Sequence, residues 1–369
     1  MKQIPLYVPV LKWRQGEYKA LKALTDDVKA IIVPLIEIPP ITWDFVEEQP
    51  QKGLRAHLEP MPRLFADYWT EKCFVDFRLL ISEPVPTEQI NESQPFDVSR
   101  ELLAFFDSLR SIASIIVPVT APSRDAAFQD SVREIATRNS TGACVRLSLE
   151  DAFGQNALSM MGSVLGVRPE LIDVVVDMQK VDPSQLPLLR IVLKGLFANL
   201  SKQGYRSLAL VGSSFPVDLS EVTPGVGSIA RSEWSLWTQM QPEIPSSVCF
   251  GDYTISHVDV REIDPRLMVA SASIRYTAEN EWLIFRGRSL REIRYGGYGQ
   301  FRTLSTQVVN HAAYSGPNFS WGDEYLFRCA HSLVGTGNLT TWRQVGTNHH
   351  ITFVARQLAN AHELSKSRA

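Results

Sequence analysis

Charged residues stand at the ends of several short apolar segments in the first two-thirds of the chain. Glu37 closes IIVPLIE, Asp177 closes DVVVD, and Asp76 lies with Arg78 in CFVDFR. A carboxylate can transfer a proton, and a neighbouring arginine or lysine can bind an anion such as phosphate. These side chains are the first candidates for chemistry, provided that the fold brings them together.

The candidates fall into two sets according to the role that we predict. Acid–base roles are predicted for Glu37, Asp76, Asp177, Asp252, His349 and His350. Contacts to a substrate are predicted for Lys12, Arg78, Arg146, Tyr253, Trp321 and Arg343. The alternative interpretation is structural: the charges would form a network of ion pairs, and one histidine would form a hydrogen bond near the end of a helix.

The apolar segments also predict the fold that must position these residues. Their starts are about 25 to 42 residues apart, which is compatible with βαβ units of roughly 30 residues. Parallel strands buried on both faces have continuous apolar sequences, as IIVPLI and SLALV do. We therefore predict a (β/α)8, TIM-barrel-like α/β domain over residues 1–260, with strands over 6–12, 31–37, 73–78, 115–120, 143–147, 173–177, 207–212 and 248–253.

Barrel enzymes carry their chemistry at the carboxyl ends of the strands, where the candidate residues lie. An open, doubly wound sheet is the alternative fold. It predicts a glycine-rich phosphate loop after the first strand, and no G-x-G-x-x-G sequence occurs there.

Residues 261–369 are predicted to form an α+β segment that packs on the barrel. Residues 271–276 and 282–286 indicate a hairpin, and helices are expected over 300–314, 323–333 and 348–364. Thr347 or Asn348 would cap the last helix. Adjacent histidines on a helix point about 100° apart, so His349 and His350 lack the spacing of a zinc pair. We predict no metal and no cofactor.

Composition limits the class of protein. The formal net charge of −3 argues against a wholly basic surface but leaves room for a local patch. The interleaved aromatic residues of YGGYGQF at 295–301 are typical of a nucleic-acid platform, and a glycine-rich link between subdomains explains them equally well. Four scattered cysteines, no signal-peptide pattern and no apolar run of 18 residues predict a cytoplasmic protein without a membrane partner.

Several longer motifs resemble one family. They are YVPVLKWRQGEYKAL, PLIEI, FGDY, SIRYT followed by Trp282, FSWGDE and WRQVGTNHHIT. From Tyr7 to Thr352 the chain resembles the "beta protein" family of bacteria and their phages. The resemblance implies a setting in phage–host conflict, with a nucleic acid or a phage or host protein as partner. It implies no particular reaction and no catalytic residue.

Two functions follow as hypotheses. The first is a metal-independent hydrolase or phosphoryl-group enzyme with its site at the barrel mouth. The second is a non-catalytic module that binds a nucleic acid or a protein. An open pocket that gathers Glu37, Asp76, Arg78 and Asp252 near a histidine would favour the enzyme, whereas a sealed or scattered arrangement would favour binding.

Overall fold

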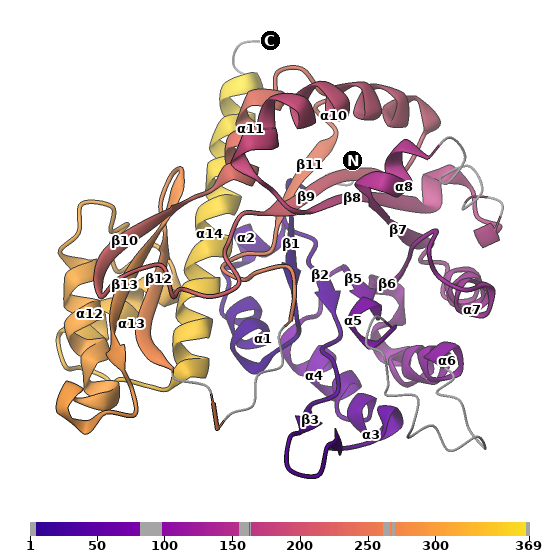
Figure 1. Cartoon of the computed structure of the whole chain (residues 1–369). Helices are drawn as coiled ribbons and strands as arrows, with labels where there is room; N and C mark the ends of the chain where they lie inside the picture. Colours follow the sequence, from indigo (N-terminus) through magenta and orange to yellow (C-terminus); the bar gives the residue numbers. More distant parts are fainter. Residues whose placement is uncertain are drawn as a thin grey trace.

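Eight parallel strands close into a barrel in this computed structural model, which describes residues 5–81, 98–154, 162, 164–260, 266–267 and 270–366 (Figure 1). The strands follow the chain around the barrel, and the last one pairs with the first. They are β1 (Tyr7–Leu11), β2 (Leu35–Glu37), β5 (Cys73–Asp76), β6 (Ile116–Thr120), β7 (Ala143–Ser148), β8 (Ile172–Lys180), β9 (Ser207–Ser213) and β11 (Val248–Asp252). The predicted (β/α)8 architecture is confirmed.

Alternate residues of each strand face opposite sides of the barrel wall. The inward residues are mainly small or β-branched, such as Val10, Val175 and Ala209, and form one interior cluster. The outward residues pack against the surrounding helices in a larger core. These helices are α1 (Gln15–Lys22), α2 (Asp26–Lys29), α3 (Leu54–Leu58), α4 (Met61–Tyr68), α5 (Arg78–Ile81), α6 (Val98–Ser108), α7 (Ala126–Arg138), α8 (Leu149–Phe153), α10 (Leu186–Leu200) and α11 (Ser232–Met240).

The long helix α14 (Leu339–Lys366) takes the position of the barrel's eighth helix (Figure 1). It packs on α1, α2 and β1, and its residues Ile351, Val354 and Leu358 join the apolar core that contains Leu21 of α1. Residues 254–338 are therefore inserted between the last barrel strand and the helix that follows it. The sequence predicted a helix start at 348, which is wrong because the helix begins nine residues earlier at Leu339.

The insertion carries a small antiparallel sheet in the order β10–β13–β12. Strands β12 (Ser271–Thr277) and β13 (Glu281–Ser289) form the predicted hairpin, and helices α12 (Gln300–Val309) and α13 (Trp321–Ala330) accompany it. Strand β10 (Gly225–Ala230) comes from before β11 and pairs with β13. The sequence also indicates a helix over 229–240, and this start is wrong because Ile229 pairs with Trp282 in the sheet and the helix begins at Ser232.

Two glycines allow α14 to lie close to the insertion. A Cβ atom on Gly322 of α13 would be 2.4 Å from the carbonyl oxygen of Val345. A Cβ atom on Gly346 of α14 would be 3.0 Å from the carbonyl oxygen of Arg275. The first distance is shorter than Cβ contacts in folded proteins and the second is tighter than most of them, so this packing favours glycine at both positions. Two further predictions from the sequence fall on residues outside the described ranges. A polar loop predicted over 83–97 lies wholly outside them, and so do residues 155–161 and 163 of a helix predicted over 150–165.

Candidate functional site

A layer of polar side chains fills the carboxyl end of the barrel, and we call it the mouth layer. Each member follows an inward-facing residue by two positions, so the pleat of the strand directs it inward as well. The interior residues Val10, Leu35, Phe74 and Cys144, for example, precede Lys12, Glu37, Asp76 and Arg146. In barrel order the layer consists of Lys12, Glu37, Asp76, Arg146, Asp177, Ser213 and Tyr253, and the apolar Ala121 takes the corresponding position after β6.

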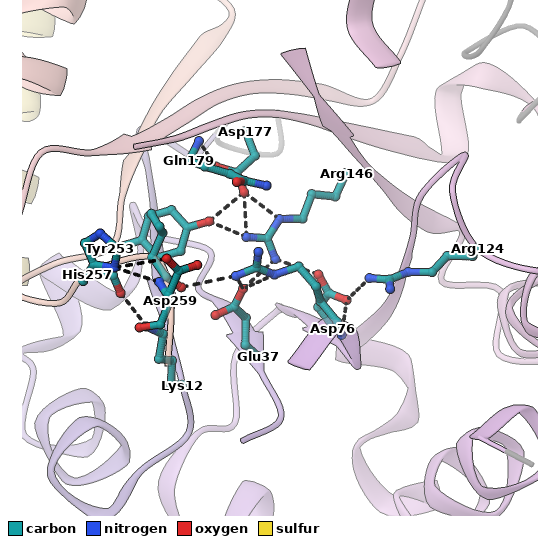
Figure 2. A network of polar contacts seen from close by, with 12 residues as sticks. Lys12, Glu37, Asp76, Arg124, Arg146, Asp177, Gln179, Tyr253, His257 and Asp259 are labelled. Atoms are coloured by element: carbon teal, nitrogen blue, oxygen red, sulfur yellow. Dashed lines mark hydrogen bonds and ion pairs between the residues drawn. The ribbon is translucent and has the colours of Figure 1, made fainter. Parts of the chain in front are cut away.

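Arg146 is the centre of this layer (Figure 2). Its Nη1 donates to Glu37 Oε1 at 2.8 Å and to Asp76 Oδ2 at 2.7 Å. Its Nε and Nη2 donate to Asp177 Oδ2 at 3.0 and 2.7 Å. Tyr253 accepts from Nη2 at 2.6 Å and donates to Asp177 at 2.6 Å. The guanidinium group of Arg146 is thus the central cation among three carboxylates.

Further cations surround this centre. Arg78 donates to Glu37 Oε1 at 3.0 Å, and Arg124 Nη2 donates to Asp76 Oδ1 at 3.3 Å. Burial alone would raise the pKa of Asp76, but the guanidinium groups of Arg146 and Arg124 hold it below its usual range. Burial lowers the pKa of Lys12 to about 8. The mouth thus combines four basic side chains, Lys12, Arg78, Arg124 and Arg146, with three acidic ones.

The backbone of residues 254–260, which we call the mouth segment, covers the mouth layer. Lys12 Nζ donates to the carbonyl oxygen of Asp259 at 3.1 Å and to that of His257. Arg78 Nη2 donates to the carbonyl oxygen of Val258 at 3.3 Å, and the Val258 side chain joins the interior cluster. Glu37 and Asp76 are completely buried as a result.

Two buried polar atoms on charged side chains of the site have no hydrogen-bond partner among the described residues. They are Glu37 Oε2 and Arg124 Nε. Glu37 Oε1, by contrast, accepts from both Arg78 and Arg146. A buried polar atom without a partner is costly, so each marks a position where a ligand group or a water molecule would form a hydrogen bond.

Asp252 does not belong to the mouth layer, although it precedes Tyr253. It faces outward, in phase with Phe250, and accepts from Tyr7 at 2.6 Å. His350 Nε2 lies 3.0 Å from Asp252 Oδ2, and His350 Nδ1 lies near two donors, Thr277 Oγ1 at 2.8 Å and Trp282 Nε1 at 3.4 Å. Trp282 can only donate, so Nδ1 accepts and Nε2 donates to Asp252. Burial lowers the pKa of His350, which keeps the ring neutral.

His349 forms a separate pair with Asp323 of α13. Its Nδ1 lies 2.8 Å from Asp323 Oδ2, and its Nε2 lies 2.9 Å from the carbonyl oxygen of Thr277. Burial opposes ionisation of Asp323, but His349 and hydrogen bonds from Ser320 and Tyr276 hold its pKa below the usual range. Both histidines lie in the interior of α14, so the predicted cap at Thr347 or Asn348 is wrong.

The structure therefore brings seven predicted site residues together and leaves five outside. Lys12, Glu37, Asp76, Arg78, Arg146, Asp177 and Tyr253 form or contact the mouth layer. Arg343 of α14 lies nearby and donates to Ser256 Oγ at 2.9 Å, which anchors the mouth segment. Trp321 packs against Tyr325 on α13, away from the mouth. Asp252, His349 and His350 join the insertion to the barrel's outer wall.

Sequence reasoning did not identify three further charged residues near these groups, Arg124, Arg231 and Glu233. Arg124 follows β6 by four residues, and this position in a strand–helix loop could have identified it. Arg231 and Glu233 flank the start of α11 and are both fully buried, 3.8 Å apart. Burial raises the pKa of Glu233 to about 7. They lie next to Asp252 and contribute to its electrostatic environment.

A second buried ion cluster lies at the opposite, amino end of the barrel. Asp173 accepts from Lys72 at 3.1 Å, from Arg206 at 3.0 and 2.5 Å, and from Ser207 at 2.6 Å. Asp173 is on β8, as Asp177 is, and is equally buried. The Asp173 cluster is therefore a buried ion cluster in the same barrel, and its variants can serve as controls for variants of the mouth layer.

Fold and site together define a parallel (β/α)8 barrel with an insertion before its eighth helix and an arginine-centred polar layer at its mouth. The family model described as Beta protein matches residues 7–356, and the chain belongs to this family. Among curated proteins, the search found no match. No described helix is long and apolar enough to cross a membrane. Within the described ranges, no group of three histidine, cysteine, aspartate or glutamate residues is arranged to bind a metal ion.

Proposed function

We propose that the mouth layer is the anion-binding site of a metal-independent hydrolase or phosphoryl-group enzyme. The carrying observation is the asymmetry of Glu37. Two arginines fix its Oε1, while its buried Oε2 has no donor among the described residues. A carboxylate held in this way is oriented to accept a proton from a ligand hydroxyl or from a water molecule.

The charge of the mouth supports an anionic ligand. Four basic side chains, Lys12, Arg78, Arg124 and Arg146, surround the carboxylates of Glu37, Asp76 and Asp177, and Glu17 lies beside Lys12. Buried arginines bind phosphate through several parallel hydrogen bonds, and their attraction to an anion is stronger where water is excluded. In this proposal phosphate oxygens replace the carbonyl oxygens of the mouth segment on Lys12 and Arg78.

Glu37 would then act as the general base. It takes a proton from the attacking water, the water oxygen bonds to phosphorus, and the bond to the leaving oxygen breaks. The leaving oxygen takes a proton from water, and Glu37 releases its proton to solvent. The cations stabilise the charge on the phosphoryl oxygens, which is the main catalytic contribution that a protein makes to phosphoryl transfer.

A specific observation also favours the second candidate, a binding module without turnover. The mouth segment seals the layer, and the two histidines that could assist catalysis lie elsewhere. In this case the mouth segment would still have to move for a ligand to enter, but no bond would be broken.

The test compares two buried carboxylates of the barrel. Glu37→Gln changes the mouth, and Asp173→Asn changes the ion cluster at the other end. Phosphate binding is measured by calorimetry, and turnover is measured with p-nitrophenyl phosphate and its diester. We expect the wild type to bind phosphate and to hydrolyse at least one substrate. Glu37→Gln should lower turnover by at least about a hundredfold, whereas Asp173→Asn should retain it.

The outcomes separate the hypotheses. Phosphate binding without turnover in the wild type would favour the binding module. Absence of phosphate binding, or equal losses in both variants with intact folds, would refute an anion site at the mouth.

A further inference from the structure

The segment from Arg286 to Arg302 is strongly basic in an acidic chain. It contains five arginines and one glutamate, a net formal charge of +4, whereas the whole chain carries −3. The segment runs from the end of β13 to the first turn of α12, in the insertion and apart from the mouth layer (Figure 1). Arg288, Arg291, Arg294 and Arg302 are exposed. The function proposed for the mouth makes no use of this surface.

Aromatic side chains lie among these arginines. The guanidinium groups of Arg288 and Arg294 are 5.2 and 4.7 Å from the centre of the Tyr295 ring. Glycines at 296 and 297 adopt φ values of 80° and 51°, which turn the chain between Tyr295 and Tyr298. Positive charge and aromatic surface are thus presented on one short segment.

Tyr298 is the outer member of a stack of rings. It stacks on Phe301 at a centroid distance of 6.1 Å, and Phe301 stacks on Trp342 at 4.5 Å with an interplanar angle of 7°. Phe301 and Trp342 are buried, whereas Tyr298 is 40% exposed. The stack therefore ends at the surface with a ring that two buried rings hold in place.

The segment is held to α12 by hydrogen bonds, so it does not depend on a ligand for its shape. Gln300 Oε1 accepts from the backbone of Arg288 at 2.8 Å, and Gln300 Nε2 donates to the carbonyl oxygen of Gly297 at 3.1 Å. A preformed surface loses less conformational entropy when a partner binds.

We propose that the segment 286–302 binds single-stranded nucleic acid. Its arginines contact phosphates, and an unpaired base stacks at Tyr298, which extends the column of Phe301 and Trp342. Proteins that bind single strands combine these two features, a cationic surface and exposed aromatic rings. An acidic protein or an anionic membrane would use the arginines but would gain nothing from the ring stack. A duplex keeps its bases paired and would also leave Tyr298 unused.

The test measures binding of a fluorescein-labelled 12-nucleotide single strand to the full chain by anisotropy. One variant replaces Arg288, Arg294 and Arg302 with alanine, and another is Tyr298→Ala. A matched control replaces Arg63, Arg133 and Arg168, three exposed arginines elsewhere, each of which has an acidic partner as Arg294 has in Glu292. Control and test variants change the net charge equally.

We expect the wild type to bind single strands with a strong dependence on salt. Loss of three phosphate contacts should reduce the slope of log affinity against log salt by about 2. Tyr298→Ala should weaken binding at least about fivefold while leaving the slope unchanged. The control should bind as the wild type does.

Three results would overturn the proposal. They are absence of single-strand binding in the wild type, an equal loss in the control, and an unchanged affinity in Tyr298→Ala. Tighter binding to polyglutamate or to phosphatidylserine vesicles than to the oligonucleotide would also contradict it. Circular dichroism of each variant shows whether the fold is intact, and Tyr298→Phe, which keeps the ring, should restore binding.

Discussion

Replacement of Arg146 by methionine tests whether one guanidinium holds the mouth layer together. The variant removes hydrogen bonds to Glu37, Asp76, Asp177 and Tyr253 and leaves three buried carboxylates with fewer cations. Removal of one partner from a buried ion pair costs about 3–5 kcal/mol. Folded proteins are typically stable by about 5–15 kcal/mol, so the expected loss is a large fraction of the total.

The pH dependence of this loss is the more specific signature. In the wild type the pKa of Asp76 is below its usual value, so its contribution to stability is present above about pH 4 and disappears in acid. In Arg146→Met the pKa of Asp76 should rise above the unfolded value. Protonation then stabilises the folded variant as the pH falls. The difference in unfolding free energy between wild type and variant should be largest at pH 8 and smaller at pH 5.

Urea denaturation followed by tryptophan fluorescence measures this difference at both values of pH. The double variant Arg146→Met/Asp177→Asn removes one of the unpaired charges. Its loss of unfolding free energy should therefore be smaller than the sum of the losses in the two single variants, by at least about 1 kcal/mol. If the methionine variant does not fold, Arg146→Lys replaces it in the same measurement. This variant keeps a positive charge but loses the planar set of paired donors. A loss below about 1 kcal/mol, or an equal loss at pH 8 and pH 5, would refute the role assigned to Arg146.

Three further predictions concern other parts of the chain. The contribution of His350 to the unfolding free energy should fall as the pH decreases below about 6.5, because the unfolded state protonates His350 more readily than the folded state does. Glu233, whose pKa is raised, acts in the opposite direction, so the wild type is compared with His350→Gln, which should lose less stability between pH 7 and pH 5; equal slopes in denaturation at pH 5 to 7 would contradict this. Gly322→Ala should cost about 1–3 kcal/mol, because its Cβ atom would meet the carbonyl oxygen of Val345, while Gly335→Ala, which has open space around it, should leave the melting temperature unchanged. Lys12→Met should speed amide hydrogen exchange in residues 254–260, because Lys12 donates hydrogen bonds to the carbonyl oxygens of His257 and Asp259. Mass spectrometry measures this exchange. Equal exchange in the wild type and the variant would show that Lys12 does not anchor the segment.

The barrel could be predicted because each of its strands is a continuous apolar run between polar stretches. The gathering of Glu37, Asp76, Arg146 and Asp177 followed from that fold, since each is an inward residue near a strand end. Side chains alternate between the two faces of a strand, so Asp252 and Tyr253 face opposite sides of the barrel wall. Asp252 is in phase with Phe250, which packs against the helices, whereas Tyr253 is in phase with Cys249, which faces the interior. Sequence reasoning treated the two as a pair and missed this difference.

Other features depend on contacts between distant parts of the chain. Strand β10 contains glycines and a serine, and it is a strand because β13 supplies its hydrogen bonds. The role of α14 depends on its contact with α1, more than 300 residues earlier. The orientation of His349 and His350 follows from that docking, and nothing in their immediate sequence indicates it. The mouth is closed by backbone carbonyl oxygens, which every residue has, so the amino-acid sequence does not indicate this closure.

The position of α14 also affects how the protein must be assembled during translation. The first βα unit leaves the ribosome long before the helix that covers it exists. Until then the apolar faces of Leu21, Leu24 and Val28 lack contacts that they make with Ile351 and its neighbours in the finished molecule. A nascent chain that stops before Leu339 therefore exposes a strip of its core, and such chains should bind chaperones or aggregate more readily than the full-length protein.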